Sequence, residues 1–218
     1  MALNLRHLLP SCWKKLSGDR RGLALTEFAV VAPVFISLGM FGFEIAYMAI
    51  TKMKVSQIAL SVADNASRLG QTDNGAFVTT IQEAQVDSVL NGSLIEGRSI
   101  DMNENGRIIL SSLEVDPRND NQFIHWQRCI GTMEVESSYG EEGDELEGMG
   151  TPEIIAPPGE AVMFAEVVYT YSPVFSGAFV GDVNFREEAA FIIRDDRNLR
   201  DPDEDGLVSG SNGIQNQC

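Results

Sequence analysis

A single acidic residue stands near the start of a long apolar run, where a charged side chain is costly. The stretch RRGLALTEFAVVAPVF places Glu27 in this run, shortly after Arg20, Arg21 and Gly22. An isolated carboxylate in an apolar setting is unfavourable unless it gains a positive partner, so the chemistry that Glu27 could do is charge pairing. The simpler interpretation is an acid in the first turns of a helix, which the helix dipole favours by about 0.3–1 kcal/mol.

Other residues that could do chemistry give weaker signals. His125 is the only histidine after the first ten residues, and no zinc spacing or nucleophile–base pair can be built from it. We interpret it as a strand residue with a polar neighbour and expect no catalytic residue and no cofactor. Asp201, Asp203 and Asp205 begin a weak match to a calcium loop, but its twelfth position lacks the bidentate glutamate. We therefore favour a solvated acidic tail and expect no metal site.

The cysteines divide between the two sides of the apolar run. Cys12 precedes the run, whereas Cys129 and Cys218 follow it. If the later part of the chain is exported, these two thiols meet an oxidising compartment and can form only one internal disulfide. We expect that bridge, and two unrelated free thiols are the alternative.

Charge is distributed unevenly along the chain. Residues 1–22 hold five basic residues and one acid, which gives them a net charge of +4. The whole chain has a net charge of −16, so residues 23–218 carry −20. An acidic body argues against a nucleic-acid partner, because binding phosphates requires a cationic surface. A basic head, an apolar run and an acidic body are together typical of a membrane protein.

The apolar run is long enough to span a bilayer. Residues 28–50 contain one charge, Glu44, and at about 1.5 Å per residue they reach about 34 Å, against about 30 Å of hydrocarbon. The positive-inside rule places the basic head in the cytoplasm and the later residues outside, with Glu44 near the distal interface. A buried helix of a soluble domain is the alternative, disfavoured because no second apolar helix of similar length follows.

Periodicity predicts an α+β fold in which an antiparallel sheet packs on the amphipathic half of a long helix. One helix is expected from Leu23 to Leu69, followed by a shorter helix over residues 77–90 and four strands, over residues 107–115, 122–130, 161–171 and 185–194. The predicted organisation is a leader at 1–22, the long helix at 23–70, an exported domain at 71–194 and a polar acidic tail at 195–218.

The junction between leader and helix carries a resemblance to a known family. GLALTEF after a basic leader resembles the processing site of type IV pilins, in which a prepilin peptidase cuts after the glycine. Glutamate is then the fifth mature residue and an aromatic residue the sixth. Here Gly22, Leu23, Glu27 and Phe28 hold these positions.

Further segments are similar to the TadE-like family, which are pilin-like minor components of the tight adherence (Tad) pilus system. They are the run EFAVVAPVF with Pro33, the acid Glu44, and the late runs VVYTYSPVF and AAFIIRDDR. The major pilins of such systems are much shorter and usually carry tyrosine after the glutamate. Phe28 and the large later domain therefore argue for a minor subunit.

The resemblance implies a pilin-like, single-pass protein of the bacterial inner membrane that acts in pilus biogenesis, adhesion and surface attachment and is not an enzyme. Its N-terminus would be cytoplasmic and its C-terminal domain periplasmic or extracellular. The implied partners are the prepilin peptidase, other minor and major Tad pilins, the inner-membrane assembly platform and membrane lipid. Cutting after Gly22 would free an amine on Leu23, which Glu27 could pair on its own helix or a neighbouring one.

Two alternatives remain at this point. One is an uncut, single-pass, membrane-anchored periplasmic module that acts by interaction. The other is a membrane-anchored hydrolase that uses exported carboxylates, which would require a pair of acids at catalytic distance with perturbed pKa values.

Overall fold

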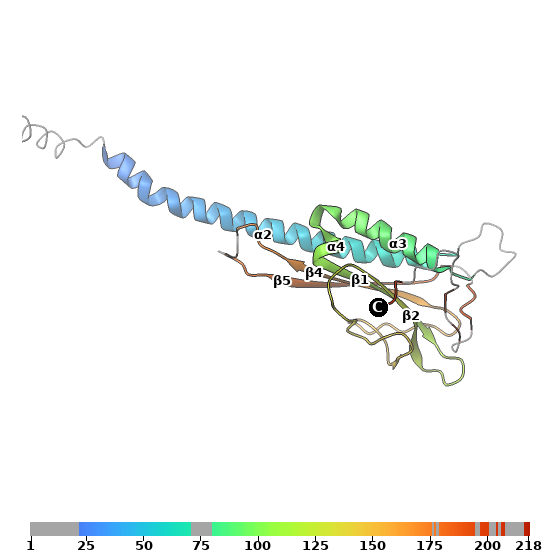
Figure 1. Ribbon diagram of the computed structural model, residues 1–218. Helices are drawn as coiled ribbons and strands as arrows, with labels where there is room; N and C mark the ends of the chain where they lie inside the picture. Colours follow the sequence, from blue (N-terminus) through green and yellow to red (C-terminus); the bar gives the residue numbers. More distant parts are fainter. Residues whose placement is uncertain are drawn as a thin grey trace, which may run out of the picture. The chain divides into compact units, whose positions relative to one another are not determined.

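A computed structural model describes residues 22–70, 80–175, 177, 179–194, 197–200, 204, 206–207 and 216–218. The chain divides into two compact units, Met1–Ala46 and Tyr47–Cys218. Helix α2, Leu23–Ser67, contributes residues to both (Figure 1). The second unit thus includes the C-terminal part of this helix, whereas the exported domain from residue 71 stays a prediction.

The described part of the first unit is the N-terminal half of α2. The helix begins at Leu23, continues through Pro33 and ends at Ser67, two residues before the predicted end. It is long and apolar enough to cross a membrane. In the part of α2 that belongs to the first unit, large apolar side chains are exposed: Leu23, Leu25, Phe28, Val30, Val31, Val34, Phe35, Ile36, Leu38, Phe41, Phe43 and Ile45.

The C-terminal half of α2 supplies the main core of the second unit. Its apolar residues recur three or four positions apart, which places them on one helical face. The predicted face is confirmed, because Val55, Ile58, Ala59, Val62 and Ala66 are all buried. This half of the helix is therefore a component of the globular fold.

Three short helical segments follow α2 along the chain and precede the first strand. They are α3 (Glu83–Glu96), the 3-10 helix η3 (Gly97–Ile100) and α4 (Met102–Asn105). The helix predicted over 77–90 thus lies further along the chain. Gln85 accepts a hydrogen bond from the backbone N–H of Gln82 at 3.0 Å, which fixes the first turn there. The helix continues past Asn91 and Gly92 because Leu90 and Ser93 face the core.

The sheet has five antiparallel strands in the order β3-β2-β1-β4-β5. The strands are β1 (Gly106–Val115), β2 (Gln122–Ile130), β3 (Glu145–Leu146), β4 (Val162–Tyr171) and β5 (Val183–Ile192). The predicted strands are confirmed to within one residue except β5, which begins and ends two residues early. The pairing of Val183 with Tyr171 sets that boundary. The two-residue β3 lies outside the four predicted strands.

Each face of the sheet carries its own apolar cluster. The larger cluster joins one face to α2 and α3 and includes Ile58, Leu90 and Tyr169. The smaller lies on the opposite face, where the cluster includes Phe164 of β4 and Met149 of the segment of residues 131–160. Figure 1 shows the helices on one side of the sheet and this segment on the other. Because successive strand residues point to opposite faces, β4 is buried on both.

A β-bulge interrupts the pairing of β1 with β2. Ser112 is paired with Trp126 and Leu113 with Ile124, so His125 is the extra residue. A bulge breaks the alternation of side chains and redirects the one it adds. His125 and Trp126 consequently both lie against Gly206 of the C-terminal tail.

Candidate functional site

The predicted processing motif lies on an exposed helix. Gly22 directly precedes α2, whose first residue is Leu23, and the side chains of Glu27, Phe28 and Pro33 are exposed. No atom lies within 4 Å of a Cβ built on Gly22, apart from its chain neighbours. The junction and the motif are thus sterically open, and within the described residues Glu27 forms no ion pair.

Glu44 differs from its exposed apolar neighbours. Its side chain is fully buried, whereas those of Phe43 and Ile45 on either side are exposed. The position near the distal membrane interface that we expected for this acid stays a prediction.

A disulfide joins the C-terminal tail to the sheet. The Sγ atoms of Cys129 and Cys218 are 2.01 Å apart, which confirms the expected bridge. The backbone N–H of Cys129 also donates to the carbonyl of Asn216 at 2.7 Å, and the Asn216 amide donates to Asp87 Oδ1 on α3 at 2.6 Å. The tail thereby covers part of the outer edge of β2.

His125 lies at the centre of a buried polar cluster. Its Nδ1 is 2.8 Å from Glu114 Oε2, and its Nε2 is 3.0 Å from the backbone carbonyl oxygen of Glu204. The hydroxyl of Ser112 donates to the other oxygen of Glu114 at 2.6 Å. Only 2% of the His125 side chain is exposed. The predicted polar neighbour of this histidine is therefore Glu114.

The surroundings of His125 alter its pKa. Burial of the ring lowers the pKa, but the hydrogen bond to Glu114, its charge, the Glu204 carbonyl and the charge of Glu142 outweigh burial and raise it above the ordinary 6.5. Glu114 is the main favourable influence, because an adjacent carboxylate stabilises the imidazolium.

The cluster does not have the geometry of a hydrolytic triad. Ser112 donates to the carboxylate of Glu114 and does not contact the ring, while the far ring nitrogen faces the Glu204 carbonyl. A triad needs a serine within reach of the free histidine nitrogen. Serine, glutamate and histidine are thus close together here without a nucleophile–base contact.

Two arginines, Arg128 and Arg186, each form an ion pair with a buried carboxylate of another element. Arg128 on β2 binds Glu83 of α3 through Nη2 at 2.5 Å, and its Nη1 binds Glu142 at 2.6 Å. On the opposite face of the sheet Arg186 Nη1 binds the fully buried Glu166 at 2.5 Å. Each pair satisfies a carboxylate that would otherwise be unfavourable to bury.

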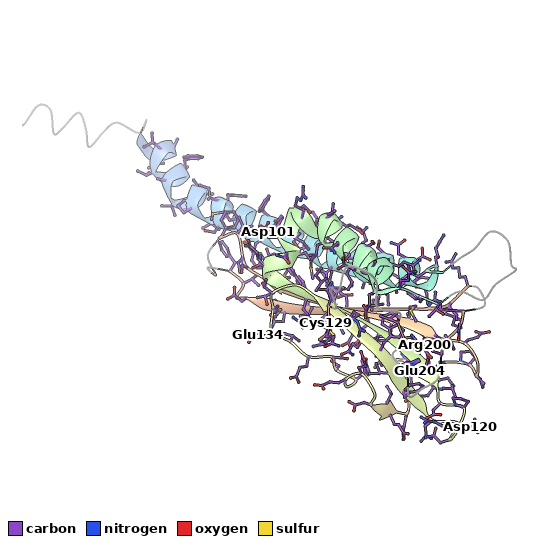
Figure 2. The ribbon with its side chains drawn as sticks, turned by 45° about the vertical axis from the view of Figure 1, so that its right-hand side comes forward. Asp101, Asp120, Cys129, Glu134, Arg200 and Glu204 are labelled. Carbon is purple, nitrogen blue, oxygen red and sulfur yellow. A yellow bond between two sulfur atoms is a disulfide. The ribbon has the colours of Figure 1, made fainter. Side chains whose placement is uncertain are left out.

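The segment over the opposite face presents many carboxylates to solvent. The exposed acids are Glu134, Glu136, Glu141, Glu142, Asp144, Glu145, Glu147, Glu153 and Glu160. A cavity of about 970 Å³ lies here, with Arg107 and Gln127 in its lining. Glu134, labelled in Figure 2, belongs to the same lining.

Metal sites were not expected, and the described residues contain no group of three or more metal-binding side chains. Asp201, Asp203 and Asp205 lie outside the described residues. The structure places the processing motif on α2 and the disulfide in the second unit. Sequence reasoning did not predict the partners of Arg128 and Arg186, and for His125 it predicted a polar neighbour without identifying it. The only sequence signal for these clusters is the presence of charged residues inside apolar strands.

Comparison of the chain with protein-family models, with curated proteins and with solved structures gives no match. The resemblance to the TadE-like family therefore rests on the residues quoted for it: the junction at Gly22, the acids Glu27 and Glu44, and the late apolar runs.

Proposed function

We propose that the chain is a pilin-like minor subunit of a Tad system, cut after Gly22 by a prepilin peptidase. The mature protein would cross the bacterial inner membrane once, with the unit Tyr47–Cys218 on the outer side, and would act in pilus biogenesis and surface attachment. It would assemble with other pilins by lateral packing of its N-terminal helix.

One observation carries this proposal. Helix α2 begins at Leu23, directly after Gly22, and from there to Phe43 its large apolar side chains are exposed, with Glu27 as the single charged residue of that stretch. Exposed apolar surface of this extent needs lipid or other helices to cover it. The first residue of α2, Leu23, is the residue that the proposed cut would make N-terminal.

The position of Glu27 supports assembly through charge pairing. Cutting after Gly22 would create an ammonium group on Leu23, four residues before Glu27 and close to it on the helix. Neighbouring helices that exclude water would make each charge unfavourable alone, and pairing between subunits would offset that cost and fix their register.

The second unit supports an exported location. Its disulfide, Cys129–Cys218, is of a kind that persists in oxidising compartments. Its exposed surface is also strongly acidic, in contrast to the basic leader.

Intact mass spectrometry of the protein isolated from membranes tests the proposal. We expect a mature chain that begins at Leu23, and we expect Gly22→Leu to leave the leader attached. Gly39→Leu is the matched control, because a Cβ at Gly22 or at Gly39 meets nothing within 4 Å. Both variants should therefore fold, and the control should still be cut. A wild-type mass that includes residues 1–22 would refute processing and favour the uncut anchor.

A further inference from the structure

The C-terminal tail docks on β2 at the bulge. A Cβ on Gly206 would lie 2.5 Å from Trp126 Cδ1 and 3.2 Å from His125 Cγ, so only glycine allows this approach. The neighbouring Leu207 is 1% exposed and belongs to the main core, as does Trp126. Glu204 precedes Gly206 by two residues, and Figure 2 shows it beside Arg200. The Nη2 atom of Arg200 donates to the Glu204 carboxylate at 2.8 Å.

Both ring nitrogens of His125 face acceptors. Nδ1 is 2.8 Å from a carboxylate oxygen of Glu114, and Nε2 is 3.0 Å from the carbonyl oxygen of Glu204. Neither of these oxygens can donate while Glu114 is ionised, so both contacts are hydrogen bonds only when each nitrogen carries a proton. The geometry therefore fits the imidazolium and not either neutral tautomer.

Loss of one proton affects the two contacts unequally. The neutral ring has a single N–H, and the charged carboxylate of Glu114 is a stronger acceptor than the Glu204 carbonyl. The remaining proton therefore stays on Nδ1. A lone pair on Nε2 then faces the carbonyl oxygen at 3.0 Å, and the two acceptors repel.

We propose that His125 is a pH-sensitive latch for the C-terminal tail, which holds Glu204, Gly206 and Leu207 in place beside the ring and Trp126 when the ring is protonated and releases them when it is neutral. The latch is independent of the proposed pilin function, because its parts all lie in the second unit.

Charges around the ring favour the protonated state. The charged groups around the ring come from three other elements: Glu114 on β1, Glu142 in the segment over the opposite face, and Glu204 in the tail, whose carboxylate is paired with Arg200. The carboxylates of Glu114 and Glu142 and the backbone carbonyl of Glu204 raise the pKa of His125 above 6.5 despite burial of the ring. Release is thus expected as pH rises through that raised pKa, and docking is complete at lower pH.

Acrylamide quenching of Trp126 fluorescence tests the latch in the full chain held in detergent. The chain has two tryptophans, so Trp13→Phe leaves Trp126 as the single indole. We expect quenching to rise in one step as the pH increases, with a midpoint above the ordinary histidine value. His125→Gln should abolish the step, and Glu114→Gln should move its midpoint to lower pH.

Glu204→Gln is the matched control, because only the backbone carbonyl of this residue contacts the ring and the step should stay at the same midpoint. An unchanged quenching profile in the wild type, or the same step in His125→Gln, would overturn the proposal. Nitrogen NMR of the ring, in a His7→Gln background, gives a result that does not depend on folding of a His125 variant. Two protonated nitrogens at pH 6.5 support the latch, and a neutral ring there refutes it.

Discussion

Removal of the disulfide should destabilise the second unit by an amount that follows from its span. Cys218→Ser is the gentler change, because Cys218 is exposed and Cys129 is buried. The hydrogen bonds that Asn216 makes to Cys129 and Asp87 need no sulfur. The native tail can therefore stay docked in the variant, and the loss arises chiefly because the unfolded chain becomes freer.

The sequence separation of the two cysteines sets the magnitude. They are 89 residues apart. In the chain-entropy model, closing a loop of this size removes about 15 cal/mol/K from the unfolded state, which is about 4.6 kcal/mol at 25 °C. For a slope of about 2 kcal/mol/M, the urea midpoint should fall by roughly 2 M.

Urea unfolding of the oxidised protein in detergent, followed by circular dichroism, measures this shift. Cys12→Ser is the matched control and should leave the midpoint unchanged, because Cys12 takes no part in the bridge. Thiol counts of the full-length, uncut chain under denaturing, non-reducing conditions should rise from one in the wild type to two in Cys218→Ser. Equal midpoints for Cys218→Ser and wild type would refute the reasoning, as would three reactive thiols in the wild type.

Three further outcomes are expected. Glu27→Gln should be cut and inserted normally but fail to co-purify with other pilus subunits, because the Leu23 amine loses its charge partner. Normal co-purification would show that Glu27 acts only as a favourable charge near the helix N-terminus. Arg128→Met should lower the free energy of unfolding by about 3–5 kcal/mol, because it leaves the buried Glu83 unpaired, and adding Glu83→Gln should recover part of that loss in the same urea assay. The raised pKa of His125 means that its stabilising contribution is complete below about pH 6.5 and is lost as pH rises through the folded-state pKa, so the unfolding free energy of wild type should fall relative to His125→Gln over that range.

Periodicity was sufficient to predict most of the regular elements. The buried face of α2 and strands β1, β2 and β4 follow from apolar residues at helical or alternating spacing, which local sequence records directly. The disulfide followed from counting, since only two cysteines lie after the apolar run. The limits of α3 depended on a hydrogen bond between Gln82 and Gln85, which is a weaker signal than hydrophobic spacing.

The polar clusters could not be predicted in the same way. Arg128 and Glu83 are 45 residues apart, and Arg186 and Glu166 are 20 apart, so their contacts depend on tertiary packing. The bulge at His125 inserts one residue without changing the apolar character of β2. Tail docking through Gly206 has no periodic sequence pattern, because it depends on one close contact of Gly206 with Trp126 and His125.

The tail that covers the edge of β2 imposes an order on biogenesis. If the second unit crosses the membrane with its N-terminal end first, β2 and the thiol of Cys129 emerge 89 residues before Cys218. At about 5–20 residues per second that interval lasts roughly 4–18 s. Through this time the strand edge is open to pairing with other chains and the thiol to mixed disulfides, so holdases and oxidoreductases on the receiving side of the membrane would act chiefly in that interval.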